Sequence, residues 1–141
     1  MNAHKFLAEK GIKKATRVLN ESPSNAQSYQ DGYYFRTTPE FLFHNGHHHW
    51  NVTTNNGQYF KDRGFDPILI SELKQVVESF ENIEFYGGFE SVKFKIKRAE
   101  FNGWLCISAP HEDGFAEWYV ENAKKAIADH ELVQAYKNGD A

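Results

Sequence analysis

The chain has 141 residues, 16% of them aromatic, and a formal net charge of −3 at pH 7. This length suits one domain, residues 1–141, with an aromatic core or interaction face. The acidic balance argues against a protein that binds nucleic acid over its whole surface, and no apolar run is long enough for a transmembrane helix. With a single cysteine and no visible signal peptide, we expect a cytoplasmic protein.

The first expected helix covers residues 4–20, because apolar side chains recur there at helical spacing. Gly11 interrupts this pattern. Either two short helices break at Gly11, or the backbone needs the freedom that glycine gives. A polar linker, residues 24–31, is expected to follow this helix.

Residues 32–60 are expected to form the sheet, because β-branched and aromatic residues are concentrated there. Residues 33–38 form its first strand, which Pro39 ends. Asn45 and Gly46 then make a two-residue hairpin turn, since both central residues of such a turn need a positive φ. Residues 58–60 form at most a short strand. The pattern predicts a three-stranded antiparallel meander around this hairpin.

The second half of the chain is expected to be mostly helical. Asp66 and Pro67 are typical of a helix start and predict a helix at 67–82. Residues 89–100 fit a strand by alternation and a helix by the spacing of their apolar residues. We favour the helix, because the pattern of Gly88 and its neighbours repeats that of Gly11 in the first helix. A long terminal helix is predicted from about residue 114 to residue 137.

Four of the seven histidines lie close to the predicted hairpin turn. Side chains alternate along strands, so a two-residue turn places one group of residues on the solvent face: Leu42, His44, His47, His49 and Asn51. The core face then holds the other group: Phe41, Phe43, His48, Trp50 and Val52. His44, His47 and His49 would hold Zn²⁺, Ni²⁺ or another divalent metal. Alternatively, they are exposed polar residues, or a pH-sensitive surface without metal.

A basic run and an aromatic group supply the other candidate binding residues. On a strand, Lys93, Lys95 and Lys97 would share a face and bind phosphate, whereas a helix would spread them around its solvated side. The aromatic residues between positions 33 and 60 would stack on nucleic-acid bases or contact a protein, although about half must face the core. The predicted binding residues are these: Tyr33, Tyr34, Arg36, His47, His49, Lys93, Lys95 and Lys97.

Two stretches carry a resemblance to a group of known proteins. Residues 73–79 together with 86–93 resemble a pattern that is common in small accessory proteins of bacteriophages and prophages. The opening residues 1–7 and 11–15 and the aromatic, Asn-Gly-rich middle resemble the same group. The resemblance implies a bacterial host cytoplasm and carries no catalytic residues across, because most such proteins have no assigned activity.

These observations predict an α+β fold, in which a small antiparallel sheet packs against about four helices. No stretch contains a diagnostic catalytic motif. The first hypothesis, which the phage resemblance implies, is a non-enzymatic accessory protein that binds a host or phage protein. Its most concrete version is inhibition of a host defence or regulatory complex. The second is a histidine-based metal-binding protein or metal-dependent hydrolase. The third is a nucleic-acid-binding protein that uses residues 93–98.

Overall fold

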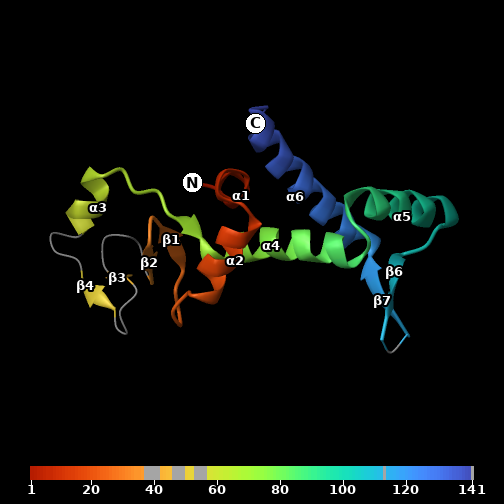
Figure 1. Cartoon of the computed structure of the whole chain (residues 1–141), viewed down its shortest axis with the longest axis horizontal. Coiled ribbons are helices and arrows are strands. Elements are labelled where there is room, and N and C mark those ends of the chain that lie inside the picture. Colours follow the sequence, from red (N-terminus) through yellow and green to blue (C-terminus); the bar gives the residue numbers. More distant parts are fainter. Residues whose placement is uncertain (37–41, 46–49, 53–56, 113, 141) are drawn as a thin grey trace. The chain divides into compact units, whose positions relative to one another are not determined.

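The computed structural model describes residues 1–36, 42–45, 50–52, 57–112 and 114–140 (Figure 1). These residues form an α+β chain, as predicted. The chain divides into two compact units, Met1–Lys74 (unit 1) and Gln75–Ala141 (unit 2). Each unit is described by itself, and the predicted single domain stays a prediction.

The N-terminal helix of unit 1 is broken at Gly11, which confirms the first of the two alternatives. α1 (Ala3–Lys10) ends there and α2 (Ile12–Asn20) begins. Gly11 has a φ of 87°, which glycine adopts without the steric cost that a Cβ brings. Asn2 caps α1 by accepting a hydrogen bond from the Lys5 N–H at 2.7 Å.

A five-stranded antiparallel sheet follows in unit 1, with the strand order β4-β3-β2-β1-β5. Its strands are short: β1 (Ser28–Gln30), β2 (Tyr33–Phe35), β3 (Leu42–His44), β4 (Asn51–Val52) and β5 (Ile68–Leu69). The meander β2-β3-β4 is confirmed. The prediction of a linker over residues 24–31 is wrong at β1, which pairs with β2 through a two-residue turn at Asp31 and Gly32. Both turn residues have positive φ, 49° and 89°, as this turn type requires.

The predicted register between β3 and β4 is also wrong. Phe43 pairs with Asn51 and Leu42 with Val52, whereas a two-residue turn at Asn45 and Gly46 predicts His48 and His49 as their partners. Residues 46–49, on which that turn falls in part, lie outside the described residues. The observed register differs from the predicted one by an odd number of residues, because Phe43 pairs with Asn51 where the prediction paired it with His48. A shift by an odd number of residues moves every side chain of one strand to the other face of the sheet. Phe43 and Asn51, which the prediction placed on opposite faces, therefore share one face.

Aromatic rings form much of the core of unit 1. Phe60 is 3% exposed and lies on α3 (Gln58–Asp62), a short helix where the sequence predicted at most a strand. Its ring makes edge contacts with those of Tyr33, Phe35, Phe43 and Phe65. Edge-to-face contacts of this kind require the plane of each ring to lie at a steep angle to the plane of its neighbour. A helical turn supplies this orientation for Phe60.

Most of unit 2 is helical. α4 (Ile70–Phe85) starts in unit 1, three residues later than predicted, because Ile68 and Leu69 pair with β1 as β5. α5 (Phe89–Asn102) confirms the helix at 89–100. It starts after Gly88, which has a φ of 101°, as α2 starts after Gly11. The predicted start of the terminal helix at residue 114 is wrong, since α6 spans Val120–Asn138. The described residues thus form six helices in place of about four.

A β-hairpin joins α5 to α6, formed by β6 (Cys106–His111) and β7 (Gly114–Tyr119). Its inner face carries Ile107 and Ala109, which are 4% exposed, and the partly buried Trp118. These side chains pack against buried residues of α5 and α6, among them Val92 and Ala123. The alternation leaves the outer face of the hairpin exposed.

No helix within the described ranges is long and apolar enough to cross a membrane.

Candidate functional site: an exposed aromatic and basic surface on α5

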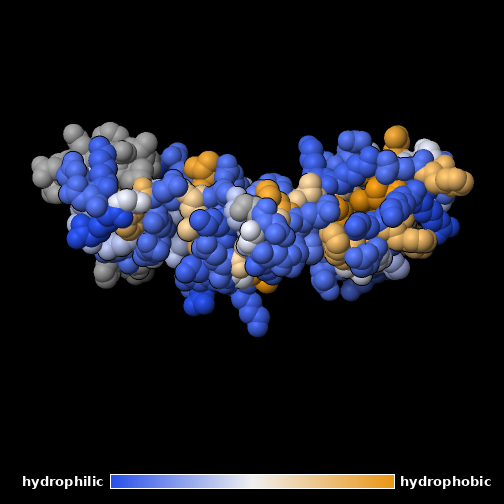
Figure 2. All heavy atoms as spheres, turned by 90° about the horizontal axis from the view of Figure 1, so that it is seen from above, coloured by the Kyte–Doolittle hydropathy of each residue, from blue (hydrophilic) through white to orange (hydrophobic). Residues whose placement is uncertain are grey.

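α5 carries apolar side chains on two opposite sides, one buried and one exposed. Val92, Ile96 and Ala99 are buried in the core of unit 2. On the opposite side, the side chains of Phe94 and Phe101 are 64% and 91% exposed. Single exposed hydrophobic residues are common on proteins, but a group of large ones marks a binding surface. Hydrophobic side chains gather on the surface of unit 2 in the space-filling view (Figure 2).

The exposed aromatic surface continues past the end of the helix. Gly103 ends α5 in the left-handed conformation, and the Trp104 N–H then donates to the Ala99 carbonyl at 2.8 Å. The Trp104 side chain is 51% exposed, and the Arg98 guanidinium lies 5.6 Å from its ring centre. Phe94, Arg98 and Phe101 are spaced i, i+4 and i+7, so they share one side of the helix. We call the following residues the α5 outer face: Phe94, Lys97, Arg98, Phe101 and Trp104.

The α5 outer face carries positive charge. Lys97 and Arg98 are exposed on it. Glu100, the nearest acidic residue along the helix, forms an ion pair with Lys124 at 2.8 Å. This pair is about half exposed and so adds little stability, but it turns the Glu100 carboxylate toward α6. The outer face therefore combines aromatic side chains with two cations that form no ion pair with any described residue.

The three predicted lysines have different positions on the helix. The Lys95 ammonium donates to the Tyr86 carbonyl at 3.0 Å and to the Ser108 carbonyl at 2.9 Å, so it links the end of α4 to β6. Lys93 lies 5.1 Å from the ring centre of Phe89, away from the outer face. Only Lys97 belongs to the surface described above, as a helix spreads these residues around its axis.

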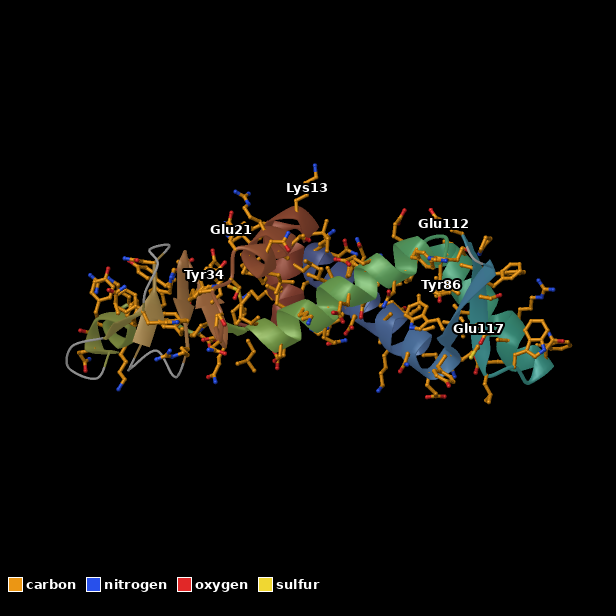
Figure 3. All side chains as sticks on the ribbon, turned by 90° about the horizontal axis from the view of Figure 1, so that it is seen from below. Lys13, Glu21, Tyr34, Tyr86, Glu112 and Glu117 are labelled. Atoms are coloured by element: carbon orange, nitrogen blue, oxygen red, sulfur yellow. The ribbon has the colours of Figure 1, made fainter. Side chains whose placement is uncertain are left out.

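The other predicted binding residues in the described range lie in unit 1. Tyr34 is buried, its hydroxyl donates to the Val18 carbonyl at 2.6 Å, and burial raises its pKa to about 12. Tyr34 is labelled in Figure 3. Tyr33 packs edge-on against Phe60. The Arg36 guanidinium lies 5.4 Å from the ring centre of Trp50. Two of these three residues thus contribute to the core.

The predicted metal site is only partly described. His44 packs edge-on against Trp50 with 5.4 Å between ring centres, although the prediction placed them on opposite faces. His44 also lines a hollow of about 360 Å³ with Lys14, Arg17 and Tyr34. His47 and His49 lie outside the described residues. Within those residues, no three His, Cys, Asp or Glu side chains gather as a metal ion would require. The metal hypothesis stays a prediction.

A second hollow, of about 520 Å³, lies between α5 and α6 beside Lys93. The His130 ring forms part of its lining and is stacked between Phe89, at 4.2 Å, and Phe80, at 4.8 Å between ring centres. Its Nδ1 atom is buried and has no hydrogen-bond partner among the described residues. Burial lowers the pKa of His130, and the charge of Lys137 lowers it further.

Because of His130, we expect the free energy of unfolding of unit 2 to decrease as the pH decreases. Its folded-state pKa lies below the ordinary value, so the unfolded chain takes up the proton first. The stability is complete above about pH 6.5 and is lost as pH falls through the folded-state pKa. Urea unfolding at several pH values below about 6.5 should show this decrease in the free energy of unfolding. In His130→Phe, the free energy of unfolding should depend less on pH. If the free energy of unfolding of the variant depended on pH as steeply as that of the native chain, groups other than His130 would be responsible for the loss.

Sequence reasoning missed the α5 outer face. The apolar stripe that predicted the helix contains Phe89, Val92 and Ile96, and it leaves Phe94 and Phe101 outside. Large aromatic residues off the stripe of an amphipathic helix are the signal that would have found this surface. No protein-family model, curated protein or solved structure matches the chain.

Proposed function

We propose that the protein is a non-enzymatic binding protein of the phage accessory type, which uses the α5 outer face to bind a host or phage protein in a bacterial cytoplasm. Inhibition of a host defence or regulatory complex is the most concrete form of this proposal. The exposure of Phe94, Phe101 and Trp104 on one surface supports the binding of a partner, and the phage and bacterial parts of the proposal rest on the resemblance of residues 73–79 and 86–93. Aromatic side chains and arginine supply most of the binding energy in protein interfaces.

The spacing of this surface defines the partner that would fit it. A helix with large apolar residues at i and i+7 is typical of recognition in which the helix lies in an apolar groove of its partner. Burying an exposed aromatic side chain contributes roughly 1.5–3 kcal/mol. Lys97 and Arg98 favour acidic residues at the rim of that groove, since complementary charge speeds association.

A single-stranded nucleic acid is the second candidate. Phe94, Phe101 and Trp104 are exposed and lie among Lys97 and Arg98. Nucleic-acid binding of this kind combines base stacking with backbone contacts and weakens steeply as salt increases. A salt-dependent gel shift that disappears in Phe101→Ser would favour this candidate over the protein partner.

A photo-crosslinking experiment tests the first candidate. A photoreactive phenylalanine at position 101 should capture a defined protein from nuclease-treated host lysate, and Arg98→Glu should reduce that capture. The control places the same group at Leu132, which is 40% exposed on α6. Crosslinks that are the same from both positions, or no captured protein, would contradict the proposal. Thermal unfolding of each variant shows that the fold is intact.

A further inference from the structure

The two outer edges of the β6–β7 hairpin differ in how well their backbone groups are protected against pairing with a further strand. The Val120 N–H donates to the Leu105 carbonyl at 2.8 Å, just beyond the last pair of the ladder, Cys106 and Tyr119. Antiparallel ladders alternate between hydrogen-bonded pairs and pairs whose backbone groups point outward. The outward positions on β7 are therefore Phe115, Glu117 and Tyr119.

The outer edge of β6 is already closed to a further strand. Its outward positions are Cys106, Ser108 and Pro110, by the same alternation. The Ser108 carbonyl accepts a hydrogen bond from the Lys95 ammonium at 2.9 Å. Pro110 has no N–H to offer, and proline and lysine are the residues that commonly protect sheet edges.

The outer edge of β7 has no such protection. β7 pairs with β6 alone in the described part of the chain. No backbone hydrogen bond outside the β6–β7 ladder uses Phe115 or Glu117 among the described residues. A strand edge with free N–H and C=O groups is a template for a further strand.

The side chains at this edge select what can pair with it. Phe115 and Tyr119 are 75% and 63% exposed, and they lie on either side of Glu117 on the outer face of the hairpin. Glu117 is labelled on β7 in Figure 3. In an antiparallel pairing of β7 with a second copy, centred on the strand, Glu117 would face its own counterpart. Like charges directly opposite each other destabilise a sheet, so charge complementarity favours a basic residue at that position.

We propose that the β7 edge binds an extended segment of another protein as an added antiparallel strand, with a lysine or arginine opposite Glu117 and apolar residues opposite Phe115 and Tyr119. Main-chain hydrogen bonds give such a complex its affinity, and the alternate side chains give it specificity. The surface is distinct from the α5 outer face, so the proposal does not depend on the function proposed above.

A charge-swap titration tests the proposal. The probe is a short acetylated and amidated threonine-rich peptide with valine, lysine and valine at alternate central positions. Added to the ¹⁵N-labelled full chain, it should shift the amide resonances of Phe115 and Glu117 and slow their hydrogen exchange. The same peptide with glutamate in place of lysine should bind at least about tenfold more weakly. Glu117→Lys should reverse this preference.

Three outcomes would overturn the proposal. One is that neither peptide shifts these amides at millimolar concentration. Another is that both peptides bind the native chain equally well. The third is that the β7 amides shift with protein concentration alone, which would show that a second copy occupies the edge. Phe101→Ser should leave peptide binding unchanged, which separates this test from that of the α5 outer face. Protection of the Val120 amide in each variant shows that the hairpin is intact.

Discussion

Replacing Phe60 with alanine should lower the free energy of unfolding of unit 1 by about 3–5 kcal/mol, the usual cost of removing a buried aromatic ring. Phe60 is 3% exposed. Its ring centre lies between 5.0 and 5.3 Å from those of Tyr33, Phe35, Phe43 and Phe65. One substitution therefore removes the common partner of four rings that come from two strands and a loop.

Urea unfolding followed by near-ultraviolet circular dichroism would measure this loss. The matched control is Tyr59→Ala, because Tyr59 is the neighbouring aromatic residue on α3 and is 49% exposed. Its ring stacks on the Arg63 guanidinium at 3.5 Å, so we expect a loss of only about 0.5–1 kcal/mol. Equal losses from the two variants would show that Phe60 is not central to the core.

The turns show both the reach and the limit of sequence reasoning. Asn45 and Gly46 have the composition of a hairpin turn, yet the register of β3 and β4 is not the one that a two-residue turn there predicts. Asp31 and Gly32 make the two-residue turn, and their dipeptide carries an equally strong signal. The strands that flank each dipeptide find partners in both cases, so the two cases differ in the register of the pair, which the dipeptide alone does not determine.

Gly11 and Gly88 show a signal that did carry through to the structure. The apolar residues around them are spaced alike, and each glycine stands before a helix with a positive φ. The carbonyls of Gly11 and Gly88 accept hydrogen bonds from the Ala15 and Val92 N–H groups at 3.1 and 2.9 Å. The local backbone determines this geometry, so the sequence predicts it well.

The hairpin residues 114–119 show where periodicity misleads. Phe115, Trp118 and Tyr119 fit a helical stripe, and this fit placed the start of the terminal helix too early. Alternation fits the same residues, since Trp118 faces the core while Phe115 and Tyr119 are exposed. Short segments often satisfy both periods, and only pairing with β6 decides between them.

The candidate site was the least predictable feature. Tyr33 and Tyr34 are predicted binding residues, and in the structure Tyr34 is buried and Tyr33 packs edge-on against Phe60. To predict the α5 outer face, one must know which side of α5 packs against the rest of unit 2. A sequence gives the stripe of a helix, but it does not say which aromatic residues outside the stripe stay uncovered.

Replacing Gly87 with alanine should destabilise unit 2 more than the same change at Gly88. Both glycines have positive φ, 107° and 101°, so alanine is strained at either position by about 1–3 kcal/mol. A Cβ at Gly87 would also lie 2.7 Å from the Ser91 Oγ, whereas nothing lies within 4 Å of one at Gly88. The difference between the two variants therefore measures the collision with Ser91 separately from the backbone strain.

These variants would be compared by urea unfolding in a chain whose Trp50 and Trp104 are replaced by phenylalanine. The tryptophan fluorescence then comes from Trp118, whose ring lies 5.0 Å from that of Tyr86. Adding Ser91→Gly to Gly87→Ala should recover the excess loss, because it removes both atoms that the new Cβ would meet. If Ser91 could simply rotate away, the two alanine variants would differ little. Such a rotation would break the hydrogen bond from the Ser91 hydroxyl to the Tyr86 carbonyl at 3.4 Å, and this long contact costs little to lose. A large difference would thus show that packing at the α4–α5 junction holds Ser91 in place.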